Sequence, residues 1–295
     1  MKARASLVTE QMKTISDISE MQRYCLALRE AGTRIVFVPT MGYLHEGHLS
    51  LLQEGRRRGD VLVLSIFVNP AQFGAGEDLD SYPRDFERDE ALARSAGVDL
   101  VFYPRAEDIY PAGFSSWLAV EGELTETLEG ACRPGHFRGV ATVVAKLFNI
   151  VQPHLALFGR KDFQQLAMIE RMVLDLNVPV EIVGMPIVRE PDGLAMSSRN
   201  VYLSADERTR SLALVASLRQ SAGLYAAGET DALKILEAAR ERLLSEPGLM
   251  IDYVKICHRR TLRDTEVVDD DSVMLLAVKV GKTRLIDNHI LSEEV

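Results

Sequence analysis

Cysteine is scarce in this chain of 295 residues, which contains three: Cys25, Cys132 and Cys257. An odd number of widely separated cysteines, with no CxxC pair, argues against a disulfide framework and against a zinc site. We therefore expect reduced thiols in a cytoplasmic protein.

Targeting and membrane-spanning segments are lacking as well. The N-terminal stretch MKARASLVTEQMKTISD has no apolar core of the kind that a signal peptide needs. The apolar run VLVLSIFV is far too short to cross a bilayer. We expect a chain without a signal peptide that binds no membrane.

Basic residues are not in excess. Lys and Arg number 34 against 43 Asp and Glu, which gives a net charge of -9. This net negative charge repels a phosphate backbone and argues against nucleic acid as the main partner. Small anionic substrates remain compatible, because a few basic groups can reverse the sign locally. The 47% hydrophobic content indicates a globular protein with one large domain or two ordinary ones.

The first two-thirds of the chain alternate apolar runs with amphipathic helical patterns. Apolar runs without alternation, separated by helices, are typical of a parallel sheet covered on both faces, and right-handed crossovers make this a Rossmann-like, doubly wound α/β domain. We predict strands at 33–39, 60–68, 98–104 and 154–159, and helices within 16–32, 42–59, 83–97, 135–151 and 162–177.

The pattern changes near Pro186. Two helical stretches, 204–228 and 230–248, precede strands within 250–258, 272–280 and 283–288, which is typical of a smaller α+β domain. We predict a nucleotide- and substrate-binding domain at 1–186 and a C-terminal lid domain at 187–295, with a cleft between them.

The stretch VPTMGYLHEGHLSLL places His45 and His48 three residues apart at the expected start of a helix. Residues at this spacing share a helix face, and the first turn also presents unpaired N–H groups and the positive end of the helix dipole. This combination predicts an anion site, such as one for phosphate. Gly47 would let a flat ligand approach the backbone.

Two other interpretations of this pair stay open. A histidine pair is about as often a solvated surface feature as a binding site. HEGH also resembles the H-E-x-x-H zinc motif, but it is one residue short and no third ligand is evident nearby.

Three further polar clusters follow predicted strands. FVNPAQFG carries Asn69 and Gln72, and DGLAMSSRN carries Ser197, Ser198 and Arg199. The third cluster, FGRKDFQQL, contributes Gly159, Lys161, Asp162 and Gln165. Each alone could be an ordinary loop. Together with the histidine pair, they predict a site at the carboxyl edge of the sheet.

These stretches, with YPRD, RPGHFRGVATVV and TRLIDN, make the chain resemble the pantothenate synthetase (pantoate–β-alanine ligase) family. That family belongs to the nucleotidyltransferase superfamily, which includes class I aminoacyl-tRNA synthetases. PTMGYLHEGH resembles its His-x-Gly-His element, and MSSRN its Lys-Met-Ser-Lys-Ser counterpart. The resemblance extends from about Thr14 to Asn288.

The resemblance implies a two-step reaction with ATP as substrate. Pantoate attacks the α-phosphate to give pantoyl adenylate and pyrophosphate, and β-alanine then displaces AMP. His45, His48 and Lys161 are the implied catalytic residues, with His48 as proton donor. The implied ATP-binding residues are Met41, Gly42, Tyr43, Leu44, His45, Glu46, Gly47, His48, Gly159, Arg160, Lys161, Asp162, Val188, Met196, Ser197, Ser198 and Arg199.

The acid and amine substrates are assigned in the same way. Gln72 and Gln165 are implied to grip pantoate, Asn69 to support that pocket, and Arg133 and His136 to meet the β-alanine carboxylate. The resemblance also implies Mg²⁺ carried by the ATP phosphates, no metal held by the protein alone, and a homodimer.

Two alternatives remain. One is another nucleotidyltransferase of the superfamily, such as a cytidylyltransferase, although Gln72 and Gln165 favour the ligase. The other is a nucleotide-binding module without catalysis. A tRNA synthetase is disfavoured by the acidic pI of 5.3.

Overall fold

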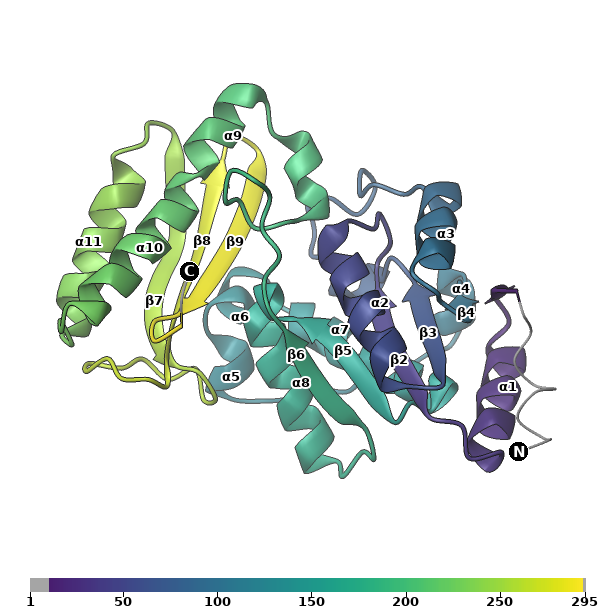
Figure 1. Cartoon of the computed structure of the whole chain (residues 1–295). Coiled ribbons are helices and arrows are strands. Elements are labelled where there is room, and N and C mark those ends of the chain that lie inside the picture. Colours follow the sequence, from purple (N-terminus) through teal and green to yellow (C-terminus); the bar gives the residue numbers. More distant parts are fainter. Residues whose placement is uncertain (1–10, 294–295) are drawn as a thin grey trace. The chain divides into compact units, whose positions relative to one another are not determined.

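Six parallel strands pair into one sheet, in the order β1-β4-β3-β2-β5-β6 (Figure 1). The structure, a computed structural model, describes residues 11–293. The strands are β1 (Lys13–Ile15), β2 (Ile35–Thr40), β3 (Val61–Ile66), β4 (Leu100–Phe102), β5 (Leu155–Gly159) and β6 (Glu181–Met185). Since β3, β2 and β5 are neighbours and parallel, their carboxyl ends share one edge of the sheet.

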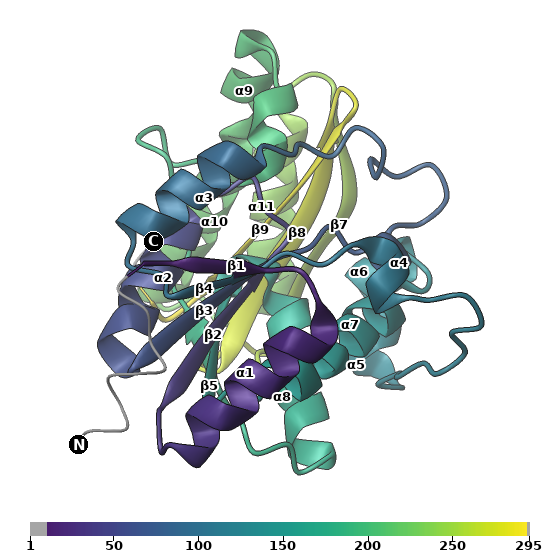
Figure 2. The same cartoon turned by 90° about the vertical axis from the view of Figure 1, so that its right-hand side faces the viewer.

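Helices cover both faces of this sheet (Figure 2). Helices α2 (Glu46–Arg58) and α3 (Phe86–Ser95) lie on one face, and α1 (Ile18–Glu30) and α7 (His136–Val151) pack together on the other. The central strands β2, β3, β4 and β5 are buried because these helices turn apolar side chains toward them, such as Leu52 of α2 at 0% exposure. Helix α8 (Phe163–Asp175) follows β5. The doubly wound parallel sheet predicted from the sequence is confirmed.

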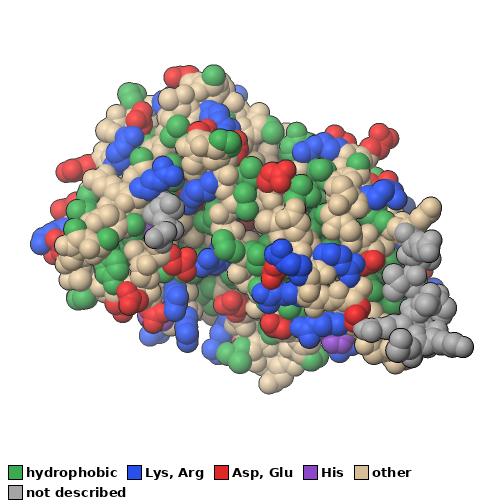
Figure 3. Space-filling model, viewed as in Figure 1, with side chains coloured by type: hydrophobic (Ala, Val, Ile, Leu, Met, Phe, Trp, Pro, Cys, Tyr) green, Lys and Arg blue, Asp and Glu red, His purple; other side chains and the backbone are tan. Residues whose placement is uncertain are grey.

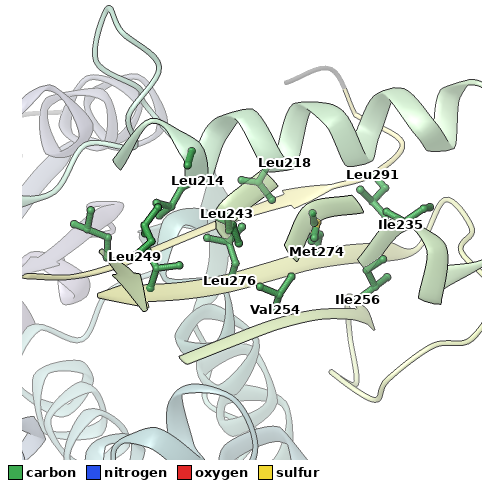
Figure 4. Close-up of a cluster of buried hydrophobic side chains, with 14 of the residues drawn as sticks. Leu214, Leu218, Ile235, Leu243, Leu249, Val254, Ile256, Met274, Leu276 and Leu291 are labelled. Atoms are coloured by element: carbon green, nitrogen blue, oxygen red, sulfur yellow. The ribbon is translucent and has the colours of Figure 1, made fainter. Parts of the chain in front are cut away.

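The C-terminal part forms a separate antiparallel sheet of β7 (Leu249–His258), β8 (Ser272–Val280) and β9 (Thr283–Ile290). Helices α9 (Ala205–Ser211), α10 (Ala213–Ala226) and α11 (Ala232–Leu244) precede it. Figure 4 shows the core between α10, α11 and the sheet, where Leu218, Leu243 and Leu276 meet at 0% exposure. The smaller α+β architecture is therefore confirmed.

The described residues group into two compact units. The first unit, which holds the parallel sheet, comprises the described part of Met1–Val120 with Arg133–Arg160 and Met168–Pro186. The second unit, which holds the antiparallel sheet, comprises Glu121–Cys132, Lys161–Ala167 and the described part of Ile187–Val295. Leu128 and Phe163 join the second unit because they pack in one apolar cluster with Leu275 of β8. The assignment of 1–186 and 187–295 as functional domains stays a prediction.

Partly buried charges tie the segment Glu121–Cys132 to the antiparallel sheet. The Arg284 guanidinium donates to both carboxylate oxygens of Glu129, each at 2.8 Å, and to Asp252 at 2.7 Å. The Tyr253 hydroxyl also donates to Glu129, at 2.9 Å. Removing one member of such a partly buried set is costly, because the remaining charge is left uncompensated.

Several elements differ from the sequence-based expectations. The edge strand β1 is absent from the prediction, since it has only three residues. A strand is expected before residues 192–200 but without bounds, and β6 lies there at Glu181–Met185, partly exposed. The long helix expected within 204–228 is two helices, because the Leu212 N–H donates to the Thr209 carbonyl in a tighter turn. Short helices also occur at α4 (Ala106–Ile109), α5 (Glu123–Glu126), α6 (Glu129–Cys132), η2 (Pro70–Gln72), η3 (Arg160–Asp162) and η4 (Ser198–Tyr202).

The surface carries acidic and basic side chains in close mixture on the face drawn in Figure 3. Cys25 and Cys257 are buried, Cys132 is exposed, and all three thiols are free. Within residues 11–293, no helix is both long and apolar enough to cross a membrane. The expectation about a signal peptide falls partly on residues 1–10, which lie outside the described residues.

Candidate active site

The turn after β2 connects the sheet to the histidine pair. Thr40 ends the strand, and its hydroxyl donates to the Ser65 carbonyl at 2.8 Å while accepting the Gly42 N–H at 3.2 Å. Gly42 and Tyr43 both have positive φ, of 82° and 50°. A Cβ on Gly42 would lie 2.9 Å from Asp89 and from Ile66, so this turn needs glycine for space as well as for conformation.

The side chain of Asp89, in α3, fixes the backbone of this turn through hydrogen bonds. Its carboxylate accepts the N–H of Tyr43 at 2.6 Å and that of Leu44 at 2.7 Å, and the side chain is 1% exposed. Burial raises the pKa of Asp89, against the opposing effect of the two N–H donors and of Arg88. The turn is therefore fixed by a carboxylate that is itself enclosed by protein.

The two histidines cap the start of α2 reciprocally. His45 is the N-cap residue; its Nδ1 accepts the Gly47 N–H at 3.2 Å, and Nδ1 of His48 accepts the His45 N–H at 3.3 Å. Their ring centroids lie 4.0 Å apart. A neutral imidazole whose Nδ1 accepts carries its proton on Nε2. Both rings therefore have Nε2–H donor groups at a helix N-terminus, an arrangement that suits an anion.

A second polar group lies after β3. Asn69 caps η2, and its Nδ2 donates to Oε1 of Gln72 at 2.9 Å. Nε2 of Gln72 in turn donates to Sδ of Met41 at 3.3 Å, which connects η2 to the turn after β2. These predicted residues are thus brought together within the parallel-sheet unit, and both amides are buried.

Arg133 and His136 lie at the start of α7, beside η2. Nδ1 of His136 lies 2.8 Å from the Gln72 carbonyl, and its Nε2 lies 3.2 Å from Arg133. Arg133 makes a bidentate ion pair with Glu77: its Nε and Nη2 each donate to one carboxylate oxygen at 2.7 Å. Burial alone would raise the pKa of Glu77, but the hydrogen bonds and charge of Arg133 outweigh it and lower that pKa. A substrate carboxylate bound by Arg133 would have to share it with Glu77.

The sequence GRKDFQQL ends β5 and starts α8. Gly159 and Arg160 belong to the parallel-sheet unit, whereas Lys161 begins a segment of the other unit, where its carbonyl accepts Nδ2 of Asn288 at 2.8 Å. Asp162 is exposed, and Lys161 is half-buried. The backbone here is anchored at the Lys161 carbonyl, and neither charged residue is fully buried.

The adjacent glutamines of α8 have different environments. Gln164 is 2% exposed and bonds the Leu124 and Thr127 carbonyls and the Glu129 N–H, so it serves the fold. Gln165 is half-buried. The assignment of Gln165 to the substrate pocket stays a prediction.

The segment from Val188 to Arg199 starts as a small hairpin. Arg189 bridges to Ala195, and the Met196 N–H donates to the Val188 carbonyl at 3.0 Å. Ser197 then caps η4 by accepting the Arg199 N–H at 3.3 Å. Ser198 is buried, and Met196, Ser197 and Arg199 are half-buried.

Metal-ligating side chains do not gather in the described part of the chain. Among residues 11–293, no group of three or more His, Cys, Asp and Glu side chains could hold a metal ion.

The family profile described as Pantoate-beta-alanine ligase matches residues 13–290. The chain belongs to the pantoate–β-alanine ligase family. It is an enzyme that ligates pantoate and β-alanine to form pantothenate, as predicted.

Individual relatives of this ligase are similar over nearly their full length. Pantothenate synthetase of Syntrophotalea carbinolica is 61% identical over 284 residues, covering 96% of this chain and 100% of the relative. A crystal structure of pantothenate synthetase from Thermus thermophilus matches with a TM-score of 0.91 and 48% identity, covering 96% of this chain and 100% of that one. The pantoate–β-alanine ligase from Francisella tularensis, complexed with beta-gamma ATP and β-alanine, has a TM-score of 0.82 and 33% identity, with 96% and 99% covered.

Asp89 is a residue of this ligase that the sequence analysis did not select. It lies in the predicted helix 83–97, on the same face as buried Ala93 and partly buried Phe86. An acidic residue within the apolar stripe of a helix was the available signal, because a buried carboxylate needs donors from elsewhere in the chain.

Proposed function

We propose that this ligase works through an enzyme-bound pantoyl adenylate. A carboxylate oxygen of pantoate attacks the α-phosphorus of ATP, and the bond to the departing pyrophosphate breaks. The amine of β-alanine then attacks the acyl carbon, the bond to the AMP oxygen breaks, and the nitrogen gives up a proton. Neither step needs a protein nucleophile; both need charge stabilisation and positioning.

The observation that carries this proposal is the histidine pair at the N-terminus of α2. With both Nδ1 atoms engaged by backbone N–H groups, His45 and His48 would direct their Nε2 donors to the α-phosphate as negative charge spreads over its oxygens. Of the two, His48 is assigned as the proton donor, and Lys161 as the cation on the phosphate oxygens.

ATP binding is assigned to three segments. Met41 to His48 would hold the phosphates and approach the purine, and Gly159 to Asp162 would hold ribose and phosphate. Val188 would line the adenine site, while Met196 to Arg199 would cover the triphosphate. In this scheme, residues 1–186 form the binding domain and 187–295 the lid.

The other substrates are assigned to side chains near η2 and α8. Gln72 and Gln165 would bind pantoate, with Asn69 supporting Gln72. Arg133 and His136 would meet the carboxylate of β-alanine. An amide N–H pairs with a carboxylate or hydroxyl oxygen without adding charge, which suits an acid that must later be attacked by an amine.

Mg²⁺ would bind mainly through the ATP phosphates and water, as it does with many nucleotide substrates. We place the enzyme in the cytoplasm as a homodimer, with ATP, pantoate and β-alanine as its small-molecule partners and no nucleic acid.

Isotope exchange tests the adenylate. The enzyme should exchange labelled pyrophosphate into ATP when pantoate is present and β-alanine absent, and omission of pantoate should abolish this exchange. His48→Ala should lose it, whereas His258→Ala, a histidine change in β7, should keep it. Exchange that requires β-alanine would contradict the two-step scheme.

A further inference from the structure

Asn69 is hydrogen-bonded through every donor and acceptor position of its amide. Its Oδ1 accepts the Tyr110 hydroxyl at 2.8 Å and the Ala71 N–H at 3.3 Å. Its Nδ2 donates to Gln72 Oε1 at 2.9 Å and to the Gly139 carbonyl at 3.2 Å. The side chain is 1% exposed, so these protein contacts take the place of water.

The chemistry of these partners determines the direction of each amide. The Gly139 carbonyl can only accept and the Ala71 N–H can only donate, which settles which end of Asn69 is the NH₂ group. Since that NH₂ faces Gln72, the Gln72 atom toward it must be the oxygen. The Gln72 NH₂ is thereby directed away from Asn69 and toward the Met41 sulfur.

Tyr110, which follows α4, is held rigidly at the other end of this chain of bonds. Its ring packs edge-on against Phe114, with 5.1 Å between the ring centroids, and stacks on Trp117, with 6.1 Å between the centroids. Burial raises the pKa of Tyr110 to about 12, so its hydroxyl keeps the proton that it donates to Asn69.

We infer that Tyr110 is a positioning residue for the acid substrate: through Asn69 it orients the Gln72 amide with its NH₂ group available to an oxygen of pantoate. This inference rests on the proposed role of Gln72. A thioether is a weak acceptor, so a carboxylate or hydroxyl oxygen readily replaces Met41 as the partner of Nε2. A reversed amide would present its oxygen to the anionic substrate and repel it.

Tyr110→Phe removes one hydroxyl and keeps the ring. The KM for pantoate should rise about 3- to 10-fold, the effect of one lost hydrogen bond, while the KM for ATP stays the same. Tyr225→Phe is the matched control, because it removes another tyrosine hydroxyl that donates to a side chain, Asp270, at 2.9 Å in the other unit. Pantoate use should be unchanged in this control.

A double-mutant cycle separates orientation from general packing. In a Gln72→Ala background, Tyr110→Phe should have no further effect on the KM for pantoate, since the amide that it orients is gone. An equal effect in both backgrounds would overturn the inference. The emission of Trp117, the single tryptophan of the chain, should stay the same in Tyr110→Phe if the aromatic packing is intact.

The cycle also distinguishes the inference from the pocket assignment on which it rests. If Gln72→Ala leaves the KM for pantoate unchanged, the assignment of Gln72 to the acid pocket is wrong. If Gln72→Ala raises it and Tyr110→Phe does not, only the role of Tyr110 is overturned.

Discussion

The backbone N–H of Leu44 donates to the buried carboxylate of Asp89 at 2.7 Å, which joins helix α3 to the turn that precedes the histidine pair. The same carboxylate receives the N–H of Tyr43, whose φ of 50° is unusual for a residue with a side chain. The conformation of a proposed nucleotide-binding turn thus depends on a residue 45 positions away in sequence.

Asp89→Ala should destabilise the protein and impair ATP use together. It leaves the buried Leu44 N–H and the partly buried Tyr43 N–H without acceptors, at up to about 1–3 kcal/mol each. Urea unfolding and the KM for ATP measure the two effects. Asp85→Ala is the control on the same helix: it removes only the N-cap acceptor of α3 and should cost about 1 kcal/mol with normal ATP use. Equal effects of the two substitutions would show that Asp89 has no special role in the turn.

Replacing either histidine should lower kcat far more than it weakens ATP binding. His45→Ala and His48→Ala should each lose on the order of 10²–10³-fold in kcat, as for other charge-stabilising donors. His45→Asn separates capping from catalysis, since asparagine is a good N-cap but has no imidazole Nε2. It should regain the stability lost in His45→Ala without regaining its activity. Near-parental kcat in both alanine variants would remove the pair from the chemistry.

Gly139→Ala should disturb the acid pocket through the backbone. Its Cβ would lie 2.2 Å from the Ala71 carbonyl oxygen and 2.7 Å from the Gln72 nitrogen, both of which are backbone atoms, so η2 must move. We expect lower stability and a raised KM for pantoate. Gly223→Ala in α10 is the control, because nothing lies within 4 Å of its added Cβ. It should stabilise the protein by about 0.5–1 kcal/mol and leave pantoate use unchanged. Unchanged stability and an unchanged KM for pantoate in Gly139→Ala would show that η2 can shift away from α7 at little cost.

The ion pair of Glu77 with Arg133 should make stability depend on acid pH. A carboxyl whose pKa is lowered on folding contributes stability that is present above its unfolded pKa and lost as the pH falls through the lowered value. The Tm difference between the parent and Glu77→Gln should therefore be constant near neutrality and shrink below about pH 4. Glu107→Gln, in a pair whose side chains are 68% and 65% exposed, should change Tm little at any pH. A Glu77 effect independent of pH would assign it to packing.

Local signals were sufficient to predict most of the fold. The continuous apolar runs that became β2, β3 and β5 are long enough to exclude most alternatives, and their loops carry the histidine pair and the amides. Strand β1 was missed because its three residues make no pattern by themselves and become a strand only by pairing with β4. Strand β6 lies at the other edge of the sheet and is partly exposed.

The residues of the candidate site also differ in how far the sequence alone could indicate them. His45 and His48 could be proposed from sequence because they lie three residues apart at the predicted start of one helix. The contacts of Asp89 and Tyr110 could not be predicted, since each side chain acts on a residue that is distant in sequence, 45 positions away for Leu44 and 41 for Asn69. Their roles come from tertiary contacts that a single sequence does not display.

The unequal exposure of the three cysteines makes the unmodified chain suitable for single-site labelling. Burial raises the pKa of Cys25 and of Cys257 to about 12, so both thiols stay protonated and shielded from electrophiles at neutral pH. Cys132 is exposed and is the residue just before Arg133. A maleimide dye should therefore attach at one position without mutagenesis, next to the proposed contact for the β-alanine carboxylate.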